Sequence, residues 1–288
     1  MGFSVVRTLK RWFTIALDAF WQFNADDGWA IASHIALSGL MSLFPFFLVL
    51  TAVAGIVGST DLANEAARLV LEAWPQEVSA PIALEIQHVL DGAQQQVLTI
   101  GVALALFFAS SGIESLRIGL NRAYAVIDER PMWLLRVESI GYVVLGTVAI
   151  LALSFLVLLA PLIMRTAIRF IPALRDFDEI ITAIRLAVAS ILIVVPLFVV
   201  HKWLPAGRRS VRQIMPGIFA TLVLWLVAGT LFGRYLADFA FTYSVYYAGL
   251  ASPMIALAFL YFTASIFIYG GELNATIEKA RLQTTAEN

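Results

Sequence analysis

The stretch AIASHIALSGLMSLFPFFLVLTAVAGIVG, residues Ala30–Gly58, contains no Asp, Glu, Lys or Arg. A helix that crosses the roughly 30 Å hydrocarbon core of a bilayer needs about 20 such apolar residues. Further stretches without these four residues follow along the chain: Val97–Ile113, Ser139–Met164, Leu186–Val200, Gln213–Gly233 and Phe239–Gly271. The fourth of the six reaches the required length if it begins near Ile180 and includes Arg185. We therefore predict six transmembrane helices.

The composition agrees with a chain whose main solvent is lipid. Of its 288 residues, 60% are hydrophobic and 14% are charged, and the mean hydropathy is +0.86. Soluble domains have about 45–50% apolar and about 25% charged residues. In lipid each backbone polar group must be satisfied within the span, and the long apolar runs fit helices better than the short alternating strands of a barrel. The expected fold is an all-α polytopic membrane helical bundle.

Basic residues favour alternate gaps between the apolar stretches. The N-terminal arm, the second and fourth gaps and the C-terminal tail together hold thirteen Lys and Arg, against six in the other gaps. The positive-inside rule then places both termini in the cytoplasm. The third gap is the exception, because it has its own cluster of arginines.

We expect a single membrane domain over residues 1–288. The predicted parts are an interfacial cytoplasmic helix within 1–29, spans at 30–58, 97–113, 139–164, 180–200, 213–233 and 246–271, a helical periplasmic loop at 59–96, and a cytoplasmic tail at 272–288. The interfacial helix is predicted because Phe3–Trp21 places apolar residues at spacings of three or four, with charged residues between them. A helix packed on the bundle is the alternative.

Three segments together carry a resemblance to a known family. They are SHIALSGLMSLFPFFLVL from Ser33, SSGIESLRIGLNRAYAVIDERP from Ser110, and YYAGLASPMIALAFLYFTASIFIYGGELNATIEK from Tyr246. The combination resembles the YihY/BrkB family of bacterial inner-membrane proteins, over essentially the whole chain. The resemblance implies a six-span topology. The labels that the family has carried, ribonuclease and virulence factor, do not amount to a mechanism. Leu37 and Ser38 stand where many members have a Tyr pair.

Polar residues at the cytoplasmic ends of two predicted spans form the main candidate site. Glu114, Arg117 and Asn121 are spaced three and then four apart, so they share a face of a continuing helix, and Arg122 lies on the flank. Glu272 and Asn274 close the last span at the same predicted depth. We expect these residues to form one polar cluster that binds substrate. The alternatives are surface ion pairs and a structural lock of the bundle.

Two other features are candidates for function. His34 is an ionisable residue inside the first span, which makes it a site hypothesis by default, and a histidine bonded to a neighbouring backbone or Ser is the alternative. Pro45 and Pro196 lie inside predicted spans, where each removes a backbone donor and can kink its helix. Interrupted helices are typical of transporter sites.

The predicted function is transport: a transporter or flippase of a lipid, an anionic envelope precursor or a small solute. The alternative is a non-transporting scaffold or partner of envelope proteins. We expect no enzyme, and ribonuclease in particular is disfavoured because His34, His88 and His201 cannot converge on the predicted topology. The chain has no cysteine, and we expect no cofactor, no metal and no nucleic acid partner. Membrane lipids are the expected partners, and an oligomer is left open.

Overall fold

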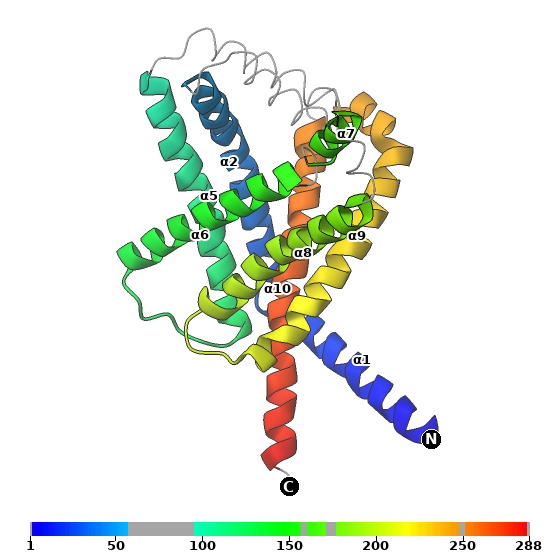
Figure 1. Cartoon of the computed structure of the whole chain (residues 1–288). Helices are drawn as coiled ribbons and strands as arrows, with labels where there is room; N and C mark the ends of the chain where they lie inside the picture. The colour runs from blue at the N-terminus through cyan, green and yellow to red at the C-terminus, as the bar shows by residue number, and fades with distance from the viewer. Residues whose placement is uncertain (1, 57–94, 157–159, 171–176, 248–250, 287–288) are drawn as a thin grey trace.

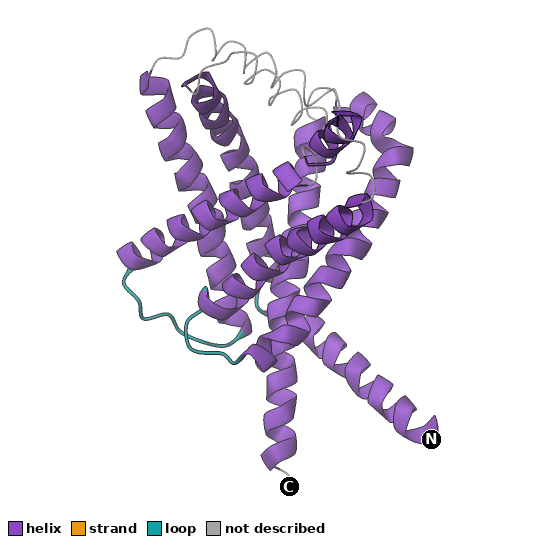
Figure 2. Ribbon diagram, viewed as in Figure 1, coloured by secondary structure: helices purple, strands orange, loops and turns teal. Residues whose placement is uncertain are grey.

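The computed structural model describes residues 2–56, 95–156, 160–170, 177–247 and 251–286, and within these ranges all regular structure is helical (Figure 2). The helices are α1 Gly2–Ala25, α2 Gly28–Ile56, α5 Gln95–Ala123, α6 Met132–Ser154, α7 Ala160–Phe170, α8 Asp178–Trp203, α9 Val211–Tyr247 and α10 Ala251–Ala286. The predicted all-α membrane bundle is confirmed.

Among the described residues, five helices are long and apolar enough to cross a membrane. These candidate spans are Thr99–Ala123, Met132–Leu153, Glu179–Trp203, Val211–Asp238 and Pro253–Gln283. In α2 a shorter apolar segment, Gly28–Leu43, stands beside these spans, within a helix that itself continues to Ile56. A multi-pass membrane protein is therefore shown, whereas the number six stays a prediction.

The helices form a bundle that closes on itself. Neighbours in the chain pack in order, α5 on α6, α6 on α8, α8 on α9 and α9 on α10, and α10 returns to contact α2 and α5. Helix α10 also contacts α1, so it is the central helix of the bundle (Figure 1). Both ends of the chain lie at the same end of the bundle, as the figure shows.

Several helices run past the apolar stretches that predicted them. Helix α5 continues to Ala123 and α10 continues to Ala286 through most of the predicted tail. The predicted span 139–164 contains parts of two helices, α6 and α7, and the predicted span at 246 begins instead with α10 at Ala251. Charge ends an apolar run but not a helix, because the intrahelical hydrogen bonds continue into the aqueous interface. The predicted loop at 59–96 lies almost entirely outside the described residues.

Two sharp turns set the directions of α1, α2 and α5. Asp27, between α1 and α2, has a φ of 59°, and the next residue is Gly28, where an added Cβ would lie 2.3 Å from the ring of Phe23. Ala125, after α5, has a φ of 50°. Left-handed backbone of this kind disfavours residues other than glycine, asparagine and aspartate, so Asp27 suits its turn, whereas the turn at Ala125 is built against local preference.

Glycines bring α9 and α10 into close contact where they cross. A Cβ added to Gly217 would lie 2.0 Å from the carbonyl oxygen of Gly270, and one added to Gly270 would lie 2.2 Å from the hydroxyl of Thr221. Glycines at this crossing let the two backbones approach to contact distance. The core beside it is apolar and includes Leu120, Ile218 and Phe267 from three different helices.

Helices α6 and α8 expose most of their apolar side chains. Exposed residues include Val144, Val148 and Ile150 on α6, and Ile184 and Ile191 on α8. Exposed apolar surface of this extent marks contact with a membrane or a partner. Because both helices belong to the candidate spans, these faces are expected to contact lipid tails.

Candidate functional site

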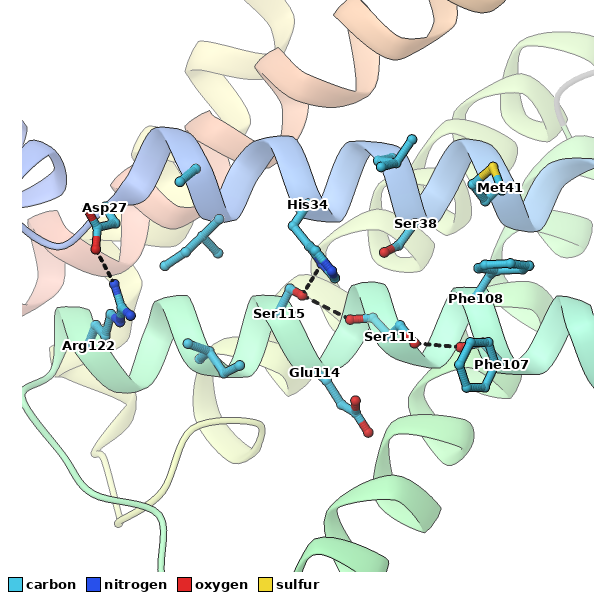
Figure 3. A pocket seen from close by; sticks show the side chains of 14 residues that line it. Asp27, His34, Ser38, Met41, Phe107, Phe108, Ser111, Glu114, Ser115 and Arg122 are labelled. Carbon is cyan, nitrogen blue, oxygen red and sulfur yellow. Dashed lines mark hydrogen bonds and ion pairs between the residues drawn. The ribbon is translucent and has the colours of Figure 1, made fainter.

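A groove of about 950 Å³ lies between α2 and α5 (Figure 3). Its two helices run side by side, and His34 of α2 points across the groove toward Ser115 of α5. The Nδ1 atom of His34 lies 2.6 Å from the Oγ of Ser115, and that hydroxyl also donates to the Ser111 carbonyl oxygen at 3.1 Å. The predicted intramembrane histidine therefore lines this groove and is held by a serine of the facing helix.

One end of the groove is charged. Asp27, from the turn before α2, and Arg122, from the last turn of α5, form an ion pair of 2.7 Å. The same Nη1 atom of Arg122 also donates to the carbonyl oxygen of Asp26 at 3.2 Å. The side chain of Arg122 is about half exposed, with a relative accessibility of 47%. Its other guanidinium nitrogens can therefore meet a ligand.

The other end of the groove is apolar. Leu37 and Met41 of α2 face Phe107 and Phe108 of α5. Leu37, Met41 and Phe107 are all exposed, so the apolar wall is open to the surroundings. Along its length the groove thus changes from a charged end, through hydroxyls and an imidazole, to an apolar end, which is the polarity profile of an amphiphile.

Glu114 and Arg117 face α6. Glu114 points away from α2 in Figure 3, and its Oε2 lies 2.9 Å from Nη1 of Arg136. Arg117 is buried and donates to the Leu135 carbonyl oxygen at 2.9 Å and to the hydroxyl of Ser139. Glu114 and Arg117 therefore share one face of α5, as predicted, and this face packs against α6.

Asn121 holds two connecting segments together. Its Oδ1 accepts from the backbone N–H of Ala206 at 2.7 Å, and its Nδ2 donates to Asp128 at 3.3 Å. Arg130 binds the same Asp128 carboxylate in bidentate fashion, at 2.8 and 2.6 Å, and reaches Glu138 at 2.8 Å and the Leu204 carbonyl oxygen at 3.0 Å. This network joins the segment after α5 to the segment after α8.

The carboxylate at the centre of that network is strongly stabilised as an anion. The hydrogen bond from Arg130 is the main cause that lowers the pKa of Asp128 to about 2, with smaller help from Asn121. Conversely, Asp128 raises the pKa of Arg130. A charged and mutually satisfied pair of this kind fits a structural role better than a catalytic one.

Asn274 and Glu272 point to different parts of the bundle. Asn274 is buried, accepts from the Gly217 N–H at 2.6 Å and donates to the hydroxyl of Tyr124 at 3.2 Å. Glu272 is also buried, and neither of its carboxyl oxygens has a hydrogen-bond partner among the described residues. No described hydrogen bond or ion pair joins Glu114, Arg117 or Asn121 directly to either residue, so the structure distributes the predicted cluster over three sides of the bundle.

Tyr124 and Arg209 extend the network around Asn274. The guanidinium carbon of Arg209 lies 3.8 Å from the centre of the Tyr124 ring, and its Nη2 donates to the Ala206 carbonyl oxygen at 2.8 Å. Burial raises the pKa of the Tyr124 hydroxyl and lowers the pKa of Arg209. The start of α9 is thus fixed to the end of α5 by a stacked cation.

The two prolines lie where the sequence predicted them. Pro45 is inside α2 and Pro196 is inside α8, and Pro216 is likewise inside α9. Pro45 is buried, whereas Pro196 is partly exposed. Neither lines the α2–α5 groove, so their predicted role in a substrate site stays a prediction.

Sequence reasoning did not select Asp27, Ser111, Ser115 or Arg136, although all four line the groove or support it. The spacing of the serines along the sequence could have identified them. His34 with Ser38, and Ser111 with Ser115, are each four apart, which places each pair on one helix face. The described residues contain no group of three or more His, Asp and Glu that could hold a metal ion.

Comparisons with known proteins agree with a membrane protein family. A family model described as "Virulence factor BrkB" matches residues 19–288. The ribonuclease-like protein YfkH of Bacillus subtilis is 27% identical over 266 residues, which cover 92% of this chain and 95% of that protein. A UPF0761 membrane protein of Pseudoalteromonas translucida is 24% identical over 267 residues, which cover 89% of this chain and 83% of the relative. No solved structure matches.

Proposed function

The chain belongs to the virulence factor BrkB family, and from this premise we propose that it carries an amphiphile with an anionic head group across the bacterial inner membrane. The observation that carries the proposal is the polarity profile of the α2–α5 groove. Arg122 and Asp27 lie at its charged end, and Met41 and Phe107 lie at its apolar end.

An amphiphile fits this profile better than a small polar solute does. The apolar wall would contribute little to the binding free energy of a solute without a tail. Such a wall stabilises a ligand by burying the apolar surface of that ligand. The guanidinium of Arg122 offers donors that suit a phosphate or carboxylate head group. A lipid or an anionic envelope precursor is therefore the proposed substrate class.

The orientation belongs to the same proposal. Arg122 lies at the charged end of the groove, and Arg122, Arg130 and Arg136 all belong to the gap that the positive-inside rule assigns to the cytoplasm. The two termini lie at one end of the bundle (Figure 1), which supports an N-in, C-in arrangement. The substrate would then enter with its head group at the cytoplasmic side.

A ribonuclease activity is not part of the proposal, although one relative is named ribonuclease-like. His201 is fully buried with its ring against Phe267, and His34 is bonded to Ser115 inside the groove. General acid–base chemistry on RNA needs such groups within hydrogen-bond reach of a polynucleotide. His201 has no such access, His34 is exposed in the groove but already bonded to Ser115, and His88 lies outside the described residues.

The proposal is tested with the purified full chain in liposomes that contain NBD-labelled phosphatidylglycerol. Movement across the bilayer is followed by quenching with dithionite. We expect faster exchange than in protein-free liposomes, and we expect Met41→Trp, which fills the groove, and Arg122→Gln to slow it. Leu145→Trp, on the exposed face of α6, and Arg234→Gln, on the exposed side of α9, are the matched controls.

Native mass spectrometry separates movement from binding. The non-transporting scaffold would be favoured by the following result. The wild-type protein retains anionic lipid and Arg122→Gln does not, yet the wild-type protein exchanges no labelled lipid. Equal lipid retention and equal exchange in wild type, Met41→Trp and Arg122→Gln would reject the groove as the site.

A further inference from the structure

Glu272 is a buried acid without a counter-ion. Its side chain is 0% exposed, and both carboxyl oxygens lack a hydrogen-bond partner among the described residues. An ionised carboxylate that is removed from water without pairing is so unfavourable that such a group binds a proton or a counter-ion instead. A buried acid of this kind inside a candidate span is a site by default.

The charged neighbour of Glu272 is another acid. Asp26, from the turn between α1 and α2, is the carboxyl that acts electrostatically on Glu272. Its Oδ2 already accepts a hydrogen bond from the Nε2 of Gln22 at 3.0 Å, which orients Asp26 as an acceptor. Two carboxyls that share a site cannot both ionise at low cost, so the pair favours one proton.

Among the described residues, no hydrogen bond or ion pair joins a cation to Glu272. From the end of α5, Tyr124 interacts with it, and that hydroxyl accepts a hydrogen bond from Asn274. Arg122, also from α5, bonds to Asp27 and to the backbone carbonyl of Asp26. From α9, the uncharged Gly217 and Thr221 lie against Gly270, two residues before Glu272. The cation Arg209 lies on the ring of Tyr124.

We propose that Glu272, with the carboxyl of Asp26 as its charged neighbour, forms a proton-binding site that holds one proton, which Glu272 carries. The site is separate from the α2–α5 groove and does not depend on the proposed transport. Asp26 belongs to the same turn as Asp27, and the ion pair between Asp27 and Arg122 closes the charged end of the groove. Loss of the proton would place two negative charges between α10 and this turn.

The test is infrared spectroscopy of the full chain in lipid nanodiscs, which detects the carbonyl stretch of a protonated carboxyl. At neutral pH we expect this band in wild type and its loss in Glu272→Gln, a neutral side chain of nearly the same shape. Glu114→Gln is the matched control, because Glu114 is ion-paired with Arg136 and should not contribute to the band. The same band intensity in wild type and Glu272→Gln would overturn the proposal.

Asp26→Asn tests whether the two acids share the proton. Removing the negative charge should make Glu272 easier to ionise, so the band should disappear at a pH at least about one unit lower than in wild type. An unchanged titration would reject Asp26 as a member of the site. Because these readouts involve no lipid movement, they stay informative even if the groove transports nothing.

Discussion

The Nδ1 atom of His34 lies 2.6 Å from the Oγ of Ser115, and this contact joins α2 to α5 inside the groove. A serine hydroxyl has one proton, and Ser115 donates it to the Ser111 carbonyl oxygen. The nitrogen of His34 is then the donor to Ser115, which fixes the imidazole tautomer. The histidine is thus held in one orientation, with its other ring nitrogen left as an acceptor.

This contact predicts energetic coupling between His34 and Ser115. Each single substitution, His34→Ala or Ser115→Ala, should lower the free energy of unfolding, and the double variant should lose less than the sum. We expect a coupling of about 0.5–1.5 kcal/mol, the usual size for a hydrogen bond. Unfolding in detergent measures it. Strict additivity would show that the two side chains do not interact.

The α9–α10 crossing should reject even one methyl group. Gly217→Ala would place its Cβ 2.0 Å from the Gly270 carbonyl oxygen, so the backbones must separate. We expect a loss of roughly 1–3 kcal/mol or more in the free energy of unfolding. Gly229→Ala on the same helix meets no atom within 4 Å and should be neutral or stabilising. Thermal unfolding of the two variants compares them, and equal losses would contradict the crossing geometry.

The Asp128–Arg130 pair predicts a defined dependence of stability on pH. The folded pKa of Asp128, about 2, lies below the ordinary value, so the pair stabilises the fold above the unfolded pKa of about 3.9. That stabilisation is lost as the pH falls through the folded pKa. We expect Asp128→Asn to cost roughly 1–2 kcal/mol at pH 6 and almost nothing near pH 2. Melting temperatures over this range measure it, and a constant difference would exclude the pair as the cause.

The sequence predicted which residues would be apolar, buried or grouped on one helix face, but not which neighbour each face would meet. Glu114 and Arg117 share a face as predicted, and the structure assigns that face to α6. Glu272 and Asn274 are two residues apart, which is about 200° around a helix, so they lie on different faces of α10. Depth in the membrane follows from the chain alone, whereas contacts between helices depend on the tertiary packing.

The turn after α5 predicts a stabilising substitution. The N–H of Ala125 donates to the Arg122 carbonyl oxygen at 2.8 Å, and the N–H of Val126 donates to the Asn121 carbonyl oxygen at 2.9 Å. A helix C-terminus with these two hydrogen bonds has one residue in the left-handed conformation, which is usually glycine. Here that residue is Ala125, with a φ of 50°.

Ala125→Gly should therefore raise the free energy of unfolding by about 1 kcal/mol, because the strain of a Cβ at positive φ is removed. Ala123→Gly is the matched control two residues earlier, where the backbone is helical and the methyl is buried, and it should lower stability by about the same amount. Thermal unfolding in detergent compares both with wild type. If both substitutions destabilise, Ala125 is not strained in the folded protein, and the turn must derive its direction from the Asn121 and Arg130 network instead.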